Sequence, residues 1–271
     1  MNAPIGVFDS GIGGLSVLKA LQVAMPHEDF IYLADSSHAP YGERDAAHVL
    51  ARSRAVTQYL VGQNVKALVV ACNTATAAAI DLLRAEQPHL PIIGVEPALK
   101  PAVALSKTGR IGVMATRSTL DSARFQTLLA AHAGGAEFVL QPCDGLADAI
   151  ERISSQADAT KLIAACALNT RAMGLFGTQP GNIDTLVLGC THYPFVSEHL
   201  QALVGVDVML VENAEAVAQQ TLRLLCAAGT AGPAANGPGA ISLLTTGDAR
   251  TLKVAAAHWL ALREPVDTLH I

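Results

Sequence analysis

Residues 68–74 read Leu-Val-Val-Ala-Cys-Asn-Thr, a short apolar run that ends in a cysteine and in residues that commonly begin helices. Similar apolar runs alternate with longer stretches of helical pattern along the whole chain. The predicted strands are 5–8, 30–33, 67–71, 92–95, 111–115, 138–140, 186–188, 208–211 and 241–244, and the helical stretches include 15–25, 46–61, 120–132 and 214–227. This alternation predicts an α/β fold with parallel sheets, in which ligands lie beyond the C-terminal ends of the strands.

A second stretch resembles the first. Residues 186–192 read Leu-Val-Leu-Gly-Cys-Thr-His, again a buried-type strand that ends in cysteine and polar residues. The likeness indicates two related domains that present equivalent cysteines, Cys72 and Cys190. Composition changes near residues 97–101 and 204–208, which places one domain at 1–97 plus 208–271 and the other at 98–207.

Composition narrows the class of protein. Of 271 residues, 51% are hydrophobic and 15% are charged, yet every apolar run is interrupted well before a membrane span, which needs roughly 20 residues. The first residues lack the basic start and apolar region of a secretory signal, so we expect a cytoplasmic protein. A net charge of −5, no Lys/Arg cluster and 4% aromatic residues disfavour a nucleic-acid partner. A small-molecule partner is expected.

Residues 8–16 read Phe-Asp-Ser-Gly-Ile-Gly-Gly-Leu-Ser, a strand that ends in an acid and a glycine-rich turn. The stretch lacks the Lys-Ser/Thr pair of a P-loop, and Ser16 stands where the last glycine of a dinucleotide-binding motif belongs. The turn is better suited to bringing a small ligand close to backbone amides, with Asp9 at the strand tip. A helix cap formed by Asp9 or Ser10 is the structural alternative. Residues 34–42, which end in Pro-Tyr-Gly, read on their own as an ordinary loop.

The two cysteines suit proton transfer at carbon. An unperturbed thiol has a pKa of about 8.5, and amides at a helix N-terminus favour the thiolate. Inversion at a carbon centre requires one base on each face of the substrate, and two equivalent cysteines meet that requirement. Each cysteine taken alone also fits a small buried hydrophobe. Five cysteines without a CxxC pair do not favour a disulfide couple, and a zinc site needs more ligands than the one well-placed histidine, His192.

Taken together, these motifs resemble the glutamate racemases of the aspartate/glutamate racemase superfamily. The resemblance rests on residues 5–18, 40–42, 71–76, 96–97 and 188–194. It implies two flavodoxin-like domains related by pseudo-two-fold symmetry, with the active site in the cleft between them. It also implies glutamate as substrate, no cofactor or metal, and a role in supplying D-glutamate for peptidoglycan.

The resemblance also implies roles for single residues. Cys72 and Cys190 become the catalytic proton donors and acceptors, with Asp9 assisting Cys72 and His192 assisting Cys190. The amino acid is then held by Asp9, Ser10, Tyr41, Gly42, Asn73, Thr74, Thr191 and His192. Glu151 is expected as an auxiliary acid beside His192, although residues 143–151 lack the prolines usual in the family.

Several questions stay open on sequence alone. Thr116 and Thr119 match family site positions and equally fit a helix cap, and residues 212–215 depart from the family pattern. Aspartate is the alternative substrate, and a non-catalytic nucleotide-binding module is the alternative from another class. A pyridoxal-phosphate racemase would need a Schiff-base lysine, which no motif supplies. The sequence does not decide between a monomer and a homodimer.

Overall fold

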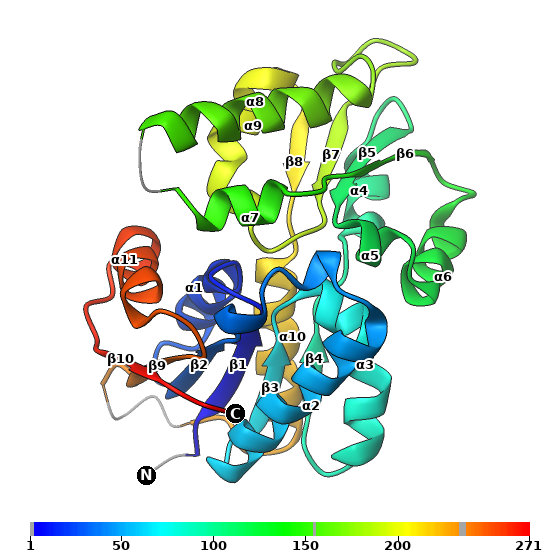
Figure 1. Ribbon diagram of the computed structural model, residues 1–271. Helices are drawn as coiled ribbons and strands as arrows, with labels where there is room; N and C mark the ends of the chain where they lie inside the picture. Colours follow the sequence, from blue (N-terminus) through cyan, green and yellow to red (C-terminus); the bar gives the residue numbers. More distant parts are fainter. Residues whose placement is uncertain (1–2, 154–155, 233–236) are drawn as a thin grey trace. The chain divides into compact units, whose positions relative to one another are not determined.

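The computed structural model describes residues 3–153, 156–232 and 237–271. The chain divides into two compact units, Met1–Val95 with Ala214–Ile271 and Glu96–Asn213 (Figure 1). Each unit is an α/β fold built on its own parallel sheet, as the strand and helix pattern predicts. Among the described residues, no helix combines the length and the apolar character that crossing a bilayer requires.

The first unit contains a six-stranded sheet of order β10-β9-β2-β1-β3-β4, with all neighbouring strands parallel. Its strands are β1 (Ile5–Asp9), β2 (Phe30–Ala34), β3 (Ala67–Val70), β4 (Ile92–Gly94), β9 (Ile241–Thr245) and β10 (Val266–Thr268). Its helices are α1 (Leu15–Ala24), α2 (Ala46–Gly62), α3 (Asn73–Glu86), α10 (Ala214–Ala227) and α11 (Ala249–Leu260), with the 3-10 turns η1 (Ser36–His38) and η2 (Tyr41–Glu43). Helix α1 packs with α10 and α11, whereas α2 packs with α3. Every residue of β1 and β3 is buried, which explains the apolar runs 5–8 and 67–70 within them.

The second unit contains a four-stranded parallel sheet of order β6-β5-β7-β8. Its strands are β5 (Arg110–Ala115), β6 (Glu137–Pro142), β7 (Thr185–Leu188) and β8 (Met209–Val211). Its helices are α4 (Leu99–Leu105), α5 (Arg117–Leu120), α6 (Ala123–His132), α7 (Leu146–Glu151), α8 (Gln156–Ala172) and α9 (Ser197–Val204), with the 3-10 turn η3 (Tyr193–Val196).

Side-chain alternation along β5 and β7 supplies a core on each face of this sheet. Val113 and Val187 belong to one cluster with α4 and α6, whereas Met114, Leu186 and Leu188 belong to another with α7, α8 and α9. Successive residues of a strand point to opposite faces, so one short strand serves both clusters. The unit is therefore a complete three-layer domain.

The two sheets share one strand order. In the first unit the order β2-β1-β3-β4 repeats the order β6-β5-β7-β8 of the second, and both match the flavodoxin-like pattern. From β1 the chain crosses to β2 on one side, and from β3 it crosses to β4 on the other side, so a topological switch point lies between β1 and β3. In the second sheet the switch point lies between β5 and β7 in the same way. Ligands of such sheets bind beyond the strand ends at that point. Cys72 follows β3 and Cys190 follows β7, so each lies at the switch point of its own sheet.

The unit boundaries differ from those expected from composition. The chain passes between the units after Val95 and after Asn213 rather than after residues 97 and 207. The reason is β8, which pairs with β7 through Leu186 and Leu210 and so completes the second sheet. Composition indicates only roughly where the chain passes from one unit to the other, at a Pro-rich stretch and at a loop. Strand pairing decides which sheet a strand joins.

Candidate active site

Cys72 occupies the N-cap of α3. Its Sγ accepts a hydrogen bond from the Ala75 backbone amide at 3.4 Å and lies 3.7 Å from the Ser10 hydroxyl oxygen. Only 5% of the cysteine is exposed. A sulfur held by amides at a helix N-terminus is stabilised as the thiolate, because the amide dipoles point at it. This geometry fits a proton acceptor.

Asp9 ends β1, directly beside the strand that leads to Cys72. Its carboxylate is buried and accepts the Gly11 backbone amide at 2.8 Å. The N-cap of helix α1 is Gly14 and the helix has no side-chain cap, so neither Asp9 nor Ser10 caps it. A Cβ at Gly14 would lie 2.6 Å from the Asp9 Cβ, so only glycine at position 14 leaves room for the Asp9 side chain. The turn thus packs around Asp9.

The first turn of α3 carries two further predicted binding residues, Asn73 and Thr74, both buried. Neither the oxygen nor the nitrogen of the Asn73 carboxamide has a hydrogen-bond partner among the described residues. A buried polar group left unpaired costs about 1–3 kcal/mol. Such an amide beside a catalytic-type thiol is suited to receive a polar ligand.

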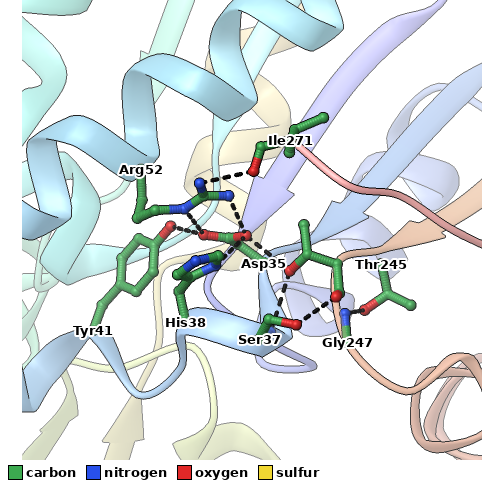
Figure 2. Close-up of polar contacts among 9 residues, drawn as sticks. Asp35, Ser37, His38, Tyr41, Arg52, Thr245, Gly247 and Ile271 are labelled. Atoms are coloured by element: carbon green, nitrogen blue, oxygen red, sulfur yellow. Dashed lines mark hydrogen bonds and ion pairs between the residues drawn. The ribbon is translucent and has the colours of Figure 1, made fainter.

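Tyr41 lies in η2 rather than in an ordinary loop, and it is buried. Its hydroxyl donates to Asp35 Oδ2 at 2.6 Å, as Figure 2 shows. Burial and the Asp35 charge raise the pKa of Tyr41 far above its usual range. The hydroxyl therefore stays protonated and is committed to Asp35. Gly42 follows it, half-buried.

Cys190 belongs to a chain of three polar groups in the second unit. Its Sγ lies 3.6 Å from His192 Nδ1, and His192 Nε2 lies 2.7 Å from Glu151 Oε1. Cys190 and His192 are both buried. A thiol beside an imidazole that is oriented by a carboxylate is the usual arrangement for activating sulfur. A Cβ at Gly189 would lie 2.8 Å from the Met114 carbonyl oxygen, so the chain needs glycine to turn into this site.

The protonation of His192 is set by opposing effects. Burial lowers its pKa, but hydrogen bonds and electrostatic interactions with Cys190 and Glu151 raise the pKa well above the usual value. These contacts favour the protonated imidazole, which lies between Cys190 Sγ and Glu151 Oε1. An imidazolium beside a thiolate can return a proton to the sulfur or stabilise its charge.

Comparison with known proteins places this geometry in a family. Residues 10–221 match the model of the Asp/Glu/Hydantoin racemase family. A glutamate racemase of Ectopseudomonas mendocina is 48% identical over 82% of this chain and 82% of its own length. Among solved structures, a glutamate racemase isoform of Bacillus anthracis superposes with a TM-score of 0.87 at 31% identity, covering 99% of this chain and 98% of that one. The chain belongs to the glutamate racemase family.

Glutamate racemases are isomerases, and similar glutamate racemases have been solved with D-glutamate or L-glutamate bound. The Escherichia coli glutamate racemase, in complex with L-glutamate and the activator UDP-MurNAc-ala, superposes with a TM-score of 0.83 at 28% identity over 98% of both chains. Membership of this family does not favour the alternative from another class, a non-catalytic nucleotide-binding module.

Thr116 and Thr119, which the resemblance matches to family site positions, form a helix start. Thr116 follows β5 at the switch point of the second sheet and caps α5 by accepting the Thr119 amide at 3.3 Å. The two hydroxyl oxygens lie 2.8 Å apart. The structure thus shows the cap directly.

The other cysteines have different surroundings. Burial raises the pKa of Cys143 to about 12 and that of Cys166 to about 11, so both stay thiols. Cys226 is exposed on α10. Within residues 3–153, 156–232 and 237–271, no group of three or more His, Cys, Asp or Glu side chains is arranged to hold a metal ion.

Sequence reasoning misses the residues around Asp35. Neither Asp35 nor Arg52 stands out in the sequence, because the stretch 34–42 reads as a loop and Arg52 lies inside an ordinary helical pattern. A charged residue at the end of the apolar strand β2 is the one signal that could have found the cluster. His38 and Tyr41 are near Asp35 in the sequence, but Thr246 is 211 residues away, and no local pattern reveals that contact.

Proposed function

We propose that this chain interconverts L-glutamate and D-glutamate without a cofactor, by proton transfer between Cys72 and Cys190. The observation that carries the proposal is the equivalent place of the two thiols. Each follows the third strand of a flavodoxin-like set, and each is close to a polar side chain, Ser10 in one unit and His192 in the other. Family members that are named glutamate racemases support glutamate as the substrate.

In the proposed reaction one cysteine acts as a thiolate and the other as a thiol. The thiolate takes the α-proton, the C–H electron pair remains on carbon as a carbanion, and the opposite thiol donates its proton to the other face. One sulfur gains a proton and the other loses one, so the reaction needs no oxidant or reductant. The transfer in the reverse direction uses the same two groups with their roles exchanged.

The neighbouring groups have proposed roles in binding and in proton transfer. Asp9 assists Cys72, and His192 with Glu151 assists Cys190. The unpaired Asn73 amide, together with Thr74 and Thr191, is proposed to neutralise the substrate carboxylates. Ser10, Tyr41 and Gly42 complete the proposed binding set, with Tyr41 acting through its backbone or ring because its hydroxyl is bonded to Asp35.

We further propose that the product D-glutamate supplies peptidoglycan synthesis, as the family resemblance implies. Aspartate is the less favoured substrate, because the similar proteins are named glutamate racemases.

The first test follows the circular dichroism of L-glutamate incubated with reduced, metal-free protein and no added cofactor. We expect the signal to decay to zero as the racemic mixture forms, and to change far less with L-aspartate. A signal that persists with glutamate would overturn the proposed activity. Cys226→Ser is the matched control for thiol loss, since this cysteine is exposed on α10.

The second test separates the two thiols. Cys72→Ala and Cys190→Ala should each lower racemisation by about a thousandfold or more, because a carbanion formed on one face then lacks a donor on the other. By resemblance, Cys190 acts on L-glutamate and Cys72 on D-glutamate. We therefore expect Cys72→Ala to exchange the α-proton of only the L-isomer with deuterated solvent, and Cys190→Ala only that of the D-isomer. Wild-type racemisation in either variant, or exchange of the same isomer by both, would refute the two-thiol assignment.

A further inference from the structure

Asp35 is the centre of a buried polar cluster outside the proposed catalytic groups (Figure 2). Arg52 donates to both of its carboxylate oxygens, from Nε to Oδ2 and from Nη2 to Oδ1, each at 2.9 Å. Tyr41 donates to Oδ2 at 2.6 Å and Thr246 to Oδ1 at 2.8 Å, while His38 Nδ1 lies 3.1 Å from Oδ1. Asp35 itself has no exposed surface.

The cluster joins segments that are far apart in the sequence. Asp35 follows β2, Arg52 lies in the middle of α2, and Thr246 follows β9. A second nitrogen of Arg52, Nη1, donates to the Ile271 carbonyl oxygen at 2.9 Å. The backbone extends the network, because the Thr246 amide donates to Ala34 and the Asp35 amide donates to the Asp9 carbonyl oxygen at 2.9 Å. The ends of β9, β2 and β1 are thus tied together.

The charges around Asp35 indicate that its carboxylate fixes neighbouring side chains in position and does not transfer protons. Burial alone would raise the pKa of Asp35, but hydrogen bonds from Arg52, Tyr41 and Thr246 and the arginine charge lower it below its usual range. Both carboxylate oxygens already accept two or more donors. A fully engaged, permanently charged carboxylate is suited to fixing its donors in place.

We propose that Arg52, acting through Asp35, is a positioning residue for the Cys72 half of the site. Two contacts connect the cluster to that half: Tyr41 packs in the same buried cluster as Cys72, and Asp35 holds the backbone of Asp9. Without Arg52 the buried carboxylate loses its counter-charge, so its hold on Tyr41 and on the β1 strand end changes. This inference rests on the proposed function and assigns Arg52 no contact with substrate.

The test compares Arg52→Gln with Arg54→Gln, a matched control on the same helix. Arg54 pairs with Glu86 at the protein surface, away from Asp35. We expect Arg52→Gln to lower kcat for racemisation by about ten- to hundredfold, the scale of a small misplacement, and Arg54→Gln to leave it unchanged. Arg52→Lys should restore part of the loss, since lysine keeps the charge but cannot form the two-pronged contact.

The deciding readout is the primary deuterium isotope effect with α-deuterated substrate. If the Cys72 step becomes limiting, the effect should rise for D-glutamate, whose proton Cys72 removes, and fall for L-glutamate. A merely destabilised protein would lose activity with both isotope effects unchanged, and that result would overturn the proposal. If Arg52→Gln does not fold, Thr246→Val gives the same test, because it removes one donor to Asp35 and keeps the ion pair with Arg52. We expect smaller changes of the two isotope effects in the same directions.

A second readout does not depend on turnover. Alkylation by iodoacetamide, followed at each cysteine by peptide mass spectrometry, should change in rate at Cys72 but not at Cys190 in Arg52→Gln. An unchanged Cys72 rate with unchanged isotope effects would refute the positioning role while leaving the racemase proposal intact. Failure of the wild-type protein to racemise glutamate would refute the proposed function alone, since the alkylation comparison still reports on positioning.

Discussion

Cys72 and Cys190 lie at equivalent strand ends, but their polar neighbours differ. Cys72 accepts the Ala75 amide and lies near the Ser10 hydroxyl, so its polar neighbours are a backbone amide and a hydroxyl. Cys190 lies beside His192, which Glu151 contacts in turn. A thiolate is stabilised by dipoles in the first case and by a cation in the second. The two half-reactions should therefore respond differently to pH.

The variant Glu151→Gln tests whether Glu151 stabilises the protonated imidazole of His192. Removing the carboxylate removes one of the two groups that raise the pKa of His192, so that pKa should fall in the variant. NMR titration of the imidazole protons measures it directly. A histidine whose pKa is raised in the folded state stabilises the protein fully at pH values below its unfolded-state pKa. This stabilisation is lost as the pH rises through the folded-state pKa, so in the variant it should be lost at lower pH.

Glu198→Gln is the matched control for this titration, because Glu198 is an exposed acid of the same unit on α9. It should leave the His192 titration as in the wild type. Racemisation by Glu151→Gln should also decline at lower pH on the alkaline side. An unchanged His192 pKa in Glu151→Gln would contradict the assigned role of the carboxylate.

At the scale of elements, the turn between β1 and α1 is fixed by close packing. A Cβ at Gly14 would come within 2.6 Å of the Asp9 Cβ and 3.0 Å of the Tyr32 hydroxyl oxygen. That hydroxyl donates to the Gly11 carbonyl oxygen at 2.7 Å. The turn therefore has room for no side chain at Gly14, and any substitution must move Asp9 or Tyr32.

Gly14→Ala should accordingly lower the free energy of unfolding by about 1–3 kcal/mol, the usual cost of overpacking. Racemisation should fall as well, because Asp9 is displaced. Gly62→Ala is the control: this glycine ends α2 with nothing within 4 Å of an added Cβ, and alanine there should stabilise by about 0.4–1 kcal/mol. Chemical denaturation measures both, and equal stability of Gly14→Ala and wild type would contradict the packing argument.

The strands could be predicted from sequence because each is a buried apolar run ended by a turn. All the predicted strands are present, with ends shifted by one or two residues. The strand β10 is not predicted, since two of its three residues are exposed at the sheet edge and carry no apolar pattern. The predicted helix at 120–132 is split, because Ser122 caps α6 separately after α5.

The site residues likewise divide into those that a local sequence motif predicts and those that only the fold brings together. Those in a motif at a strand end, such as Cys72 and Cys190, could be selected because sequence neighbours supply their surroundings. The hydrogen bond between Thr246 and Asp35 joins residues that strand pairing alone brings together, across β9 and β2. Only the family resemblance predicts the contact of Glu151 with His192, since a separate helix, α7, carries the acid.

At the scale of the molecule, the second unit is a continuous stretch inserted between β4 and α10 of the first. Its two ends lie together, because the Asn213 side-chain amide donates to the Glu96 carbonyl oxygen at 2.8 Å. Its sheet and both of its core clusters are made from its own residues. A unit with its own cores and adjacent ends has the features of an independently folding domain.

We therefore expect the fragment 96–213 to fold alone, with one cooperative thermal transition and an α/β circular dichroism spectrum, and to lack racemase activity because it has no Cys72. The shorter fragment 98–207, cut where composition changes, is the matched comparison. It loses β8 and with it Val208 and Val211, one from each core cluster. Removal of a large buried side chain typically costs about 2–5 kcal/mol, so 98–207 should melt at a much lower temperature or remain unfolded. Equal stability of the two fragments would show that β8 is dispensable to the second sheet, and an unfolded 96–213 would show that this unit depends on the rest of the chain.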